Sequence, residues 1–191
     1  MNNVSSFVLA VSDSHGNVAA LTTALIWANQ IYLAQDKVFS AAVFLGDGAG
    51  DLAAASSQAG FTVPWYKVRG NDDLDFSIPD SLVIEIPVAG GSPRKLFLAH
   101  GNRHGVDGSR QTIAACAKAA GAEAALFGHI HVPHCSVANG IFLLNPGSIG
   151  RSRSDAGPTF AVLECPAAGP LSARFYNLVN GKAKLLVYSL S

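Results

Sequence analysis

The sequence predicts an α/β fold that forms one domain over residues 1–191. Between residues 7 and 68, apolar runs of strand length alternate with segments that have helical spacing. That alternation is typical of a layered α/β sheet. A polar motif follows each of these apolar runs, and ligands bind at this edge of open α/β sheets. The length suits a single domain with its own hydrophobic core.

The first half of the chain is expected to contain three buried strands and two helices in alternation. The strands are predicted at residues 7–11, 41–45 and 63–68, and the helices at residues 18–34 and 51–59. Asn17 is a residue type favoured at a helix N-cap, and Gly60 is typical of the residue that follows a helix.

The second half begins with a predicted hairpin and continues with one helix and five strands. The hairpin joins residues 82–87 to 95–99, the helix covers residues 107–120, and the strands cover residues 124–127, 141–144, 160–163, 173–179 and 184–188. Asp107 or Ser109 is expected to cap the helix, and Gly121 to end it. The pair Asn180-Gly181 predicts a type I′ turn between the last two strands.

The composition bears on whether the protein binds nucleic acid, enters a membrane or works in an oxidising compartment. The formal net charge is zero, with 13 basic and 13 acidic residues, so there is no strong nucleic-acid signature. No apolar run approaches the roughly 18 residues of a membrane helix, and residues 1–11 are expected to be a first strand and not a signal peptide. Three cysteines without a C-x-x-C spacing indicate reduced thiols, so we expect a cytoplasmic protein. Homo-oligomerisation is left open.

Five polar motifs at successive strand ends predict a metal centre. They are Asp13-Ser14-His15, Gly46-Asp47, Gly70-Asn71-Asp72-Asp73, His100-Gly101-Asn102 and Gly128-His129-Ile130-His131. Each motif alone is common in ordinary turns, but five at one sheet edge are not explained by turns. Oxygen and imidazole ligands without thiolates suit Mn, Fe, Zn, Ni or Co better than calcium or a structural zinc site.

The order of these motifs, followed by Asn145-Pro146-Gly147-Ser148, resembles the calcineurin-like metallophosphoesterases. The small bacterial and archaeal YfcE-like phosphodiesterases are the most similar branch, and the resemblance runs from Val8 to about Arg153. It implies a single metallophosphoesterase domain with a four-layer αββα sandwich, in which two mixed sheets are flanked by helices. It also implies two divalent metal ions. One would be held by Asp13, His15 and His131, the other by Asn71, His100 and His129, and Asp47 would bridge them.

The resemblance further implies the activity. We expect a metal-dependent phosphoesterase that hydrolyses phosphodiesters or small phosphomonoesters through a hydroxide shared by the two metals. Mn²⁺ is the expected metal, with Ni²⁺, Fe²⁺, Zn²⁺, Co²⁺ or Mg²⁺ as alternatives, and a small phosphate ester is the expected substrate. The alternative is a non-catalytic scaffold like the retromer cargo-recognition subunit. Degenerate members of that kind lose metal ligands, whereas all seven ligand positions here carry competent side chains.

Two positions depart from the pattern of this branch and concern the acid that would protonate the leaving group. Asp72 stands where many relatives have histidine, or cysteine in this branch, and Asn102 stands where a second histidine is usual. Cations near Asp72 would lower its pKa, so we expect a preference for good leaving groups. His104 is the other candidate acid, although His104 and His134 also fit solvated loop histidines.

Four arginines flank the motifs and offer bidentate phosphate binding. Arg103 is the strongest candidate, and the weaker candidates are Arg69, Arg151 and Arg153. Asp73 is expected to orient the loop that carries Asn71, and residues 145–148 are expected to form a rigid turn behind the site.

Overall fold

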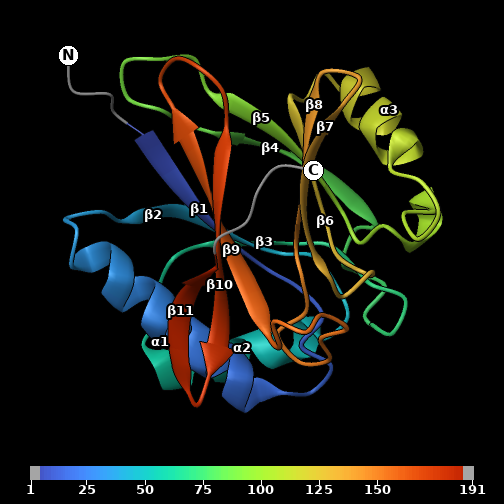
Figure 1. Ribbon diagram of the computed structural model, residues 1–191. Coiled ribbons are helices and arrows are strands. Elements are labelled where there is room, and N and C mark those ends of the chain that lie inside the picture. Colours follow the sequence, from blue (N-terminus) through green and yellow to red (C-terminus); the bar gives the residue numbers. More distant parts are fainter. Residues whose placement is uncertain (1–4, 187–191) are drawn as a thin grey trace.

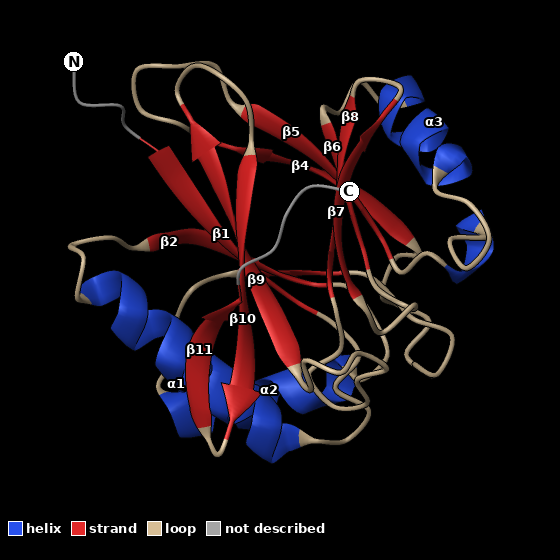
Figure 2. Cartoon of the chain, in the orientation of Figure 1, coloured by secondary structure: helices blue, strands red, loops and turns tan. Residues whose placement is uncertain are grey.

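The computed structural model describes residues 5–186 of the 191-residue chain. Its strands form two mixed sheets that pack face to face, and helices cover the outer face of each sheet (Figures 1 and 2). The expected αββα layer order is therefore confirmed. None of the helices within residues 5–186 combines the length and apolar character needed to cross a bilayer.

The first sheet has six strands in the order β11-β10-β9-β1-β2-β3. Their bounds are β1 Ser5–Val11, β2 Phe39–Phe44, β3 Trp65–Lys67, β9 Thr159–Pro166, β10 Ser172–Val179 and β11 Lys182–Leu186. Strands β1, β2 and β3 are parallel, so their carboxyl ends share one edge. The predicted type I′ turn between β10 and β11 is confirmed, because Asn180 and Gly181 have φ values of 51° and 71°. The last predicted strand extended to Tyr188, which lies outside the described residues.

The second sheet has five strands in the order β4-β5-β6-β8-β7. Their bounds are β4 Ser81–Ile86, β5 Arg94–Ala99, β6 Ala124–Phe127, β7 Pro133–Ala138 and β8 Ile141–Pro146. Strands β5, β6 and β8 are parallel, and β7 pairs with β8 in the antiparallel sense. Strand β7 was not predicted, because an edge strand that begins at a proline and mixes polar with apolar residues gives a weak pattern.

Within residues 5–186, three α-helices and two 3₁₀ helices complete the fold. They are α1 Val18–Leu33, α2 Leu52–Ala59, α3 Gln111–Ala119, η1 Ala49–Asp51 and η2 Asn102–His104. The N-cap prediction for α1 is confirmed, since the Asn17 side chain accepts a hydrogen bond from the Ala20 N–H. The cap predicted for α3 is wrong. The helix starts later, after Arg110, because residues 105–109 are occupied by turns between η2 and α3.

Hydrophobic cores fill the three interfaces between these layers. The central core lies between the sheets and includes the fully buried side chains of Val8, Leu98 and Leu126. Helices α1 and α2 cover a second core on the first sheet, and α3 covers a third core on the other sheet. Both sheets are thus anchored on each face, and the loops at their shared carboxyl edge are held by rigid strands.

Candidate metal centre

The loops that carry the predicted motifs meet at the edge where the parallel strands of both sheets end (Figure 1). Backbone hydrogen bonds join them across the sequence. The Asp13 N–H donates to the Gly46 carbonyl at 2.9 Å, and the Gly128 N–H donates to the His100 carbonyl at 2.9 Å. The first bond joins the loops after β1 and β2, and the second joins the loops after β5 and β6. The His129 N–H links the two pairs, because it donates to Asp13 Oδ2 at 3.2 Å.

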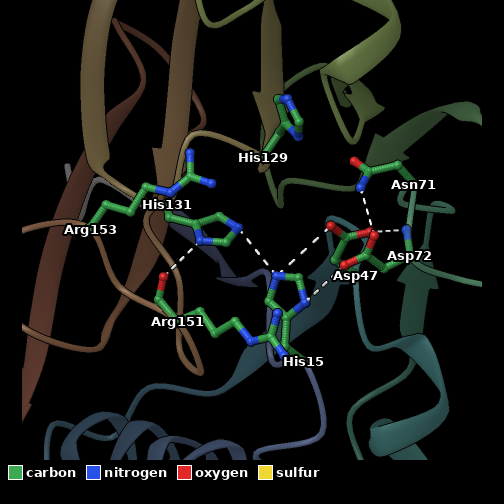
Figure 3. Close-up of a pocket in the computed structure, with 8 residues that line it drawn as sticks. All are labelled: His15, Asp47, Asn71, Asp72, His129, His131, Arg151 and Arg153. Atoms are coloured by element: carbon green, nitrogen blue, oxygen red, sulfur yellow. Dashed lines mark hydrogen bonds and ion pairs between the residues drawn. The ribbon is translucent and has the colours of Figure 1, made fainter.

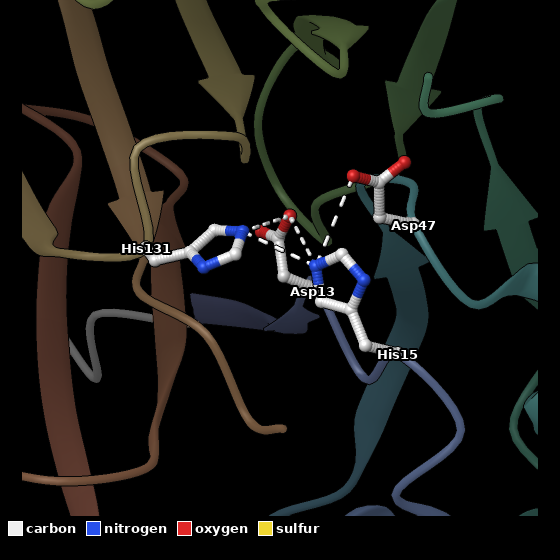
Figure 4. A group of neighbouring side chains, drawn as sticks. All are labelled: Asp13, His15, Asp47 and His131. Atoms are coloured by element: carbon white, nitrogen blue, oxygen red, sulfur yellow. Dashed lines mark hydrogen bonds and ion pairs between the residues drawn. The ribbon is translucent and has the colours of Figure 1, made fainter. Parts of the chain in front are cut away.

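Four of the predicted ligands form a compact group that can hold a metal ion (Figure 4). One ligand atom from each of Asp13, His15, Asp47 and His131 lies within 4.8 Å of the others. The Asp13 Oδ1 is 3.1 Å from His131 Nε2 and 3.9 Å from His15 Nε2. The Nε2 atoms of His15 and His131 are 3.2 Å apart. All of these atoms point toward one small volume.

The hydrogen bonds of this group show that its ligand atoms have lone pairs available for a cation. His131 Nδ1 lies 2.7 Å from the Arg151 carbonyl, and a carbonyl only accepts, so Nδ1 carries the hydrogen. In the neutral ring the Nε2 lone pair then faces Asp13 Oδ1, a buried oxygen that accepts no hydrogen bond. A buried polar atom without a partner is costly. A divalent cation bound to His131 Nε2 and Asp13 Oδ1 would give both atoms a partner, so these side chains fit a metal ion.

A second group adjoins the first and contains His100, Asn71 and His129. His100 is buried, and its Nδ1 donates to the Leu45 carbonyl at 2.7 Å. Its Nε2 lies 3.1 Å from Asn71 Oδ1 and 3.2 Å from Asp47 Oδ2. The His129 ring packs edge-on against the His100 ring, with centroids 5.2 Å apart.

Asp47 lies between the two groups. Its Oδ2 is 3.2 Å from His100 Nε2 and 3.9 Å from His15 Nε2, so one carboxylate faces both sets of imidazoles. The backbone around it is fixed by Asp73, whose carboxylate accepts hydrogen bonds from the N–H groups of Asp47, Gly48, Ala49 and Gly70. Asp73 therefore holds the loops after β2 and β3 together, as the sequence predicted for the second of them.

Electrostatics in the metal-free site favour charged forms of three ligands. Burial opposes the charge on Asp47, but the hydrogen bond and the charge of His100 bring its pKa below the ordinary value. Burial disfavours protonated His100, yet Asp47 and Asp13 raise its pKa above the ordinary value. A protonated His131 can donate its Nε2–H to Asp13, and this interaction is the main cause that raises the pKa of His131. These neighbours therefore favour the protonated over the neutral imidazole at His100 and His131.

Five of the seven predicted ligands have a left-handed backbone, which L-residues with side chains rarely adopt. Their φ values are 56° for Asp13, 44° for His15, 58° for Asp47, 71° for His129 and 58° for His131. Each such residue costs on the order of 1–3 kcal/mol and persists because the surrounding structure imposes it. Such strain concentrates at functional sites, and sequence patterns do not reveal it.

The ligands open onto a pocket of about 220 Å³ (Figure 3). It is lined by His15, Asp47, Asn71, Asp72, His129, His131, Arg151 and Arg153. The two arginines were weak candidates from the sequence, although they follow closely on residues 145–148. Residues 145–148 do not form the predicted turn, because Asn145 and Pro146 are the last residues of β8. The segment is nevertheless fixed behind the site, because the Ser148 hydroxyl donates to the Asp13 carbonyl at 2.8 Å and accepts from the Arg151 N–H at 2.7 Å.

The two other arginine candidates and His104 lie outside the pocket lining. Arg103 is 3.5 Å from Asp80, and Arg69 pairs with the same carboxylate. His104 packs edge-on against Phe97 with centroids 5.9 Å apart and is half-buried, so it is not the solvated loop histidine that was considered.

His134 is also half-buried and belongs to β7, where its Nε2 lies 2.8 Å from the Ser136 hydroxyl. The interpretation of His134 as a solvated loop histidine is therefore wrong as well. Asp72 does line the pocket, with Oδ2 at 3.4 Å from His15 Nδ1 and a side chain that is 55% exposed.

Sequence comparison places this site among known proteins. The family model of the calcineurin-like phosphoesterase superfamily domain matches residues 7–168. The probable metallophosphoesterase YsnB of Bacillus subtilis (strain 168) is 31% identical over 172 residues, which cover 89% of this chain and 90% of that protein.

Solved structures share the fold along the whole length. A predicted phosphoesterase from Streptococcus pneumoniae TIGR4 matches with a TM-score of 0.69 and 22% identity, covering 95% of this chain and 97% of that one. The zinc complex of Vps29 from Entamoeba histolytica matches with a TM-score of 0.69 and 21% identity, covering 94% and 97%. Together with the family match over residues 7–168, this shows that the chain belongs to the calcineurin-like phosphoesterase superfamily.

Proposed function

We propose that the protein is a metal-dependent phosphoesterase that hydrolyses phosphodiesters or small phosphomonoesters. The observation that carries this proposal is the unpartnered Asp13 Oδ1, buried opposite the Nε2 lone pair of His131. Family membership supports the reaction class, and the open pocket beside the ligands gives a phosphate ester room to bind.

The proposed centre holds two divalent ions. Asp13, His15 and His131 would bind the first ion. Asn71, His100 and His129 would bind the second, and Asp47 would bind both. When bound, two such ions would lower the pKa of a shared water and neutralise charge on the phosphoryl oxygens. Mn²⁺ is the proposed metal, because mixed oxygen and imidazole ligands suit it.

Arg151 and Arg153 are proposed to bind the phosphate. Both line the pocket, and a guanidinium presents several N–H groups in a plane that matches phosphate oxygens. Arg151 has a second task, because its carbonyl accepts the hydrogen bond from His131 Nδ1. The same residue thus orients a ligand through its backbone and reaches the pocket with its side chain.

The proposed reaction has no strong general acid. Asp72 lies beside His15, where cations would stabilise its ionised form, and an ionised carboxylate cannot give a proton to the leaving group. Arg103 and His104 do not line the pocket, so we give them no part in the reaction. The rate should therefore rise steeply as the pKa of the leaving group falls, and a flat dependence across a series of aryl phosphodiesters contradicts this part of the proposal.

A hydrolysis assay tests the function itself. Purified protein is incubated with bis(p-nitrophenyl) phosphate and with p-nitrophenyl phosphate, first with Mn²⁺ and then after chelation. Activity is expected with Mn²⁺ and should vanish on chelation and in Asp47→Ala. If the folded protein hydrolyses neither substrate with any divalent metal, the proposed enzymatic function is wrong and the scaffold alternative is favoured. Metal binding alone does not separate the two, since the Vps29 structure described above is itself a zinc complex.

A further inference from the structure

Three of the four predicted ligand histidines, His100, His129 and His131, are each held by an oxygen through one ring nitrogen, but His129 differs from the other two. His100 and His131 both use Nδ1, and their partners are backbone carbonyls at 2.7 Å. His129 uses Nε2, and its partner is the Asp107 Oδ2 at 2.9 Å. An ionised carboxylate only accepts hydrogen bonds, so Nε2 of His129 carries the hydrogen and its Nδ1 keeps the lone pair.

We propose that Asp107 is a positioning residue that sets the tautomer of His129 and presents its Nδ1 to the second half of the metal centre. The inference rests on the two-ion site of the proposed function. Asp107 lies outside every motif singled out as a source of ligands, and it was expected only to cap a helix. A carboxylate behind a ligating imidazole fixes the ring orientation and increases the basicity of the nitrogen that binds the metal.

Asp107 is held in place from its own side by buried neighbours. Val106 is fully buried, and it packs so close to Gly101 that a β-carbon there would lie 2.8 Å from Val106 Cγ2. Asp107 itself lies within turns, because the N–H groups of Gly108 and Ser109 both donate to the Gly105 carbonyl at 3.1 Å. The side chain of Asp107 itself is 61% exposed, so its replacement leaves the core intact.

His129 is equally constrained. Its backbone is left-handed with φ of 71°, and its N–H donates to Asp13 Oδ2 at 3.2 Å. Its ring is confined on one side by His100, with an interplanar angle of 71°. In Figure 3 the ring stands apart from the His15–His131 pair and is not joined to it. Asp107 is therefore the polar partner that decides which nitrogen of His129 is free.

The first test reads the tautomer directly in the metal-free protein. Imidazole ¹⁵N NMR at alkaline pH should show His129 protonated on Nε2, and His100 and His131 on Nδ1. In Asp107→Ala the His129 signals should move toward a mixture of tautomers. Asp107→Asn keeps an acceptor oxygen and should retain most of the native tautomer. An unchanged His129 spectrum in Asp107→Ala overturns the proposal.

The second test reads metal affinity by Zn²⁺ calorimetry on the same proteins. Asp107→Ala should weaken one of the two binding events by about 10- to 100-fold and leave the other unchanged, with Asp107→Asn in between. Ser136→Ala is the matched control, because it removes the oxygen partner of His134, a histidine outside the pocket. It should leave both binding events unchanged.

The outcomes also separate this inference from the function on which it rests. Wild-type protein that binds fewer than two ions contradicts the two-ion site and overturns the inference with it. Wild-type protein that binds two ions, while Asp107→Ala binds both with unchanged affinity, overturns the positioning role alone.

Discussion

Asp13 presents to the ligand imidazoles a buried carboxylate oxygen without a hydrogen bond. Its carboxylate is fully buried, Oδ2 accepts the His129 N–H at 3.2 Å, and Oδ1 has no hydrogen-bond donor. An asparagine in this position would keep the acceptor for His129 and turn an NH₂ group toward the lone pair of His131 Nε2. The native carboxylate is thus better suited to a cation than to the neutral imidazole that faces it.

We predict that Asp13→Asn stabilises the metal-free protein by about 1–3 kcal/mol at a pH where His131 is neutral, because it supplies a buried acceptor with a donor. It should also abolish stabilisation by Mn²⁺. Urea unfolding with and without chelator measures both effects. Asp36→Asn is the matched control, since Asp36 is exposed and has a similar φ of 55°. Lower stability of metal-free Asp13→Asn contradicts this interpretation of the site.

The histidine pKa shifts give a second prediction, on pH. His100 and His131 have pKa values raised above 6.5 in the folded metal-free protein. Their protonation therefore contributes stability that is complete below about pH 6.5 and is lost as the pH rises through the raised values. Metal affinity should instead increase as the pH rises, because protons must leave the imidazoles before the metal binds.

Metal-free protein should thus become less stable as the pH rises above about 6.5, while the stabilisation by Mn²⁺ grows over the same range. Urea unfolding at a series of pH values, with chelator or with Mn²⁺, checks both trends. A metal-free stability that does not change across this range is the contrary result.

At the scale of elements, the site depends on loops that approach each other more closely than side chains allow. Gly70, after β3, lies against the Asp47 carboxylate, and a β-carbon there would overlap Asp47 Oδ1 and its backbone nitrogen. The Asp73 carboxylate joins the same two loops through four N–H groups. The distance between the ends of β2 and β3 is therefore set by a glycine and an aspartate that bind no metal themselves.

Gly70→Ala should displace Asp47, lower stability by about 1–3 kcal/mol and weaken Mn²⁺ binding by at least tenfold. Calorimetric titration and thermal unfolding measure these effects. Gly50→Ala is the control, since a β-carbon at Gly50 would have no other atom within 4 Å, and it should be neutral or slightly stabilising. Native Mn²⁺ affinity in Gly70→Ala would show that the loop contact does not position Asp47.

Among the helices and strands, the burial pattern decides which ones the sequence could predict. Strong apolar runs such as β1, β2, β6 and β8 were predictable because both of their faces are buried. Strand β7 was not, because an edge strand carries no such pattern. The start of α3 was missed because Asp107 is a good cap by type but contacts His129 instead.

Some features of the site could be predicted from the sequence, and others depend on tertiary contacts. Its ligand types and order are local in the sequence, so the motifs indicated them. The contributions of Arg151 and Arg153 depend on how Ser148, just after β8, is bonded to Asp13, which is a long-range contact. The placement of Arg103 toward Asp80 and of His104 toward Phe97 is also set by tertiary packing. Residue type alone made both of them candidates.

At the scale of the whole molecule, the metal should link the two sheets, because its proposed ligands come from loops of both. Binding to the folded state alone stabilises a protein by about 2.7 kcal/mol at a ligand concentration 100 times Kd. For a domain of this size, that corresponds to a Tm increase of roughly 5–10 °C. Mn²⁺ should produce such a shift in the wild-type protein and in Asp36→Asn, and little or none in Asp47→Ala. An equal shift in Asp47→Ala would mean that the metal binds elsewhere.

The central claim is that both groups of ligands hold a metal ion, with Asp47 between them. Anomalous diffraction from crystals grown with excess Mn²⁺ tests it most directly. We expect two peaks about 3.5–4 Å apart. One should lie among Asp13, His15 and His131 and the other among Asn71, His100 and His129, with Asp47 in contact with both. A single peak, or none, under these conditions contradicts the proposed two-ion centre.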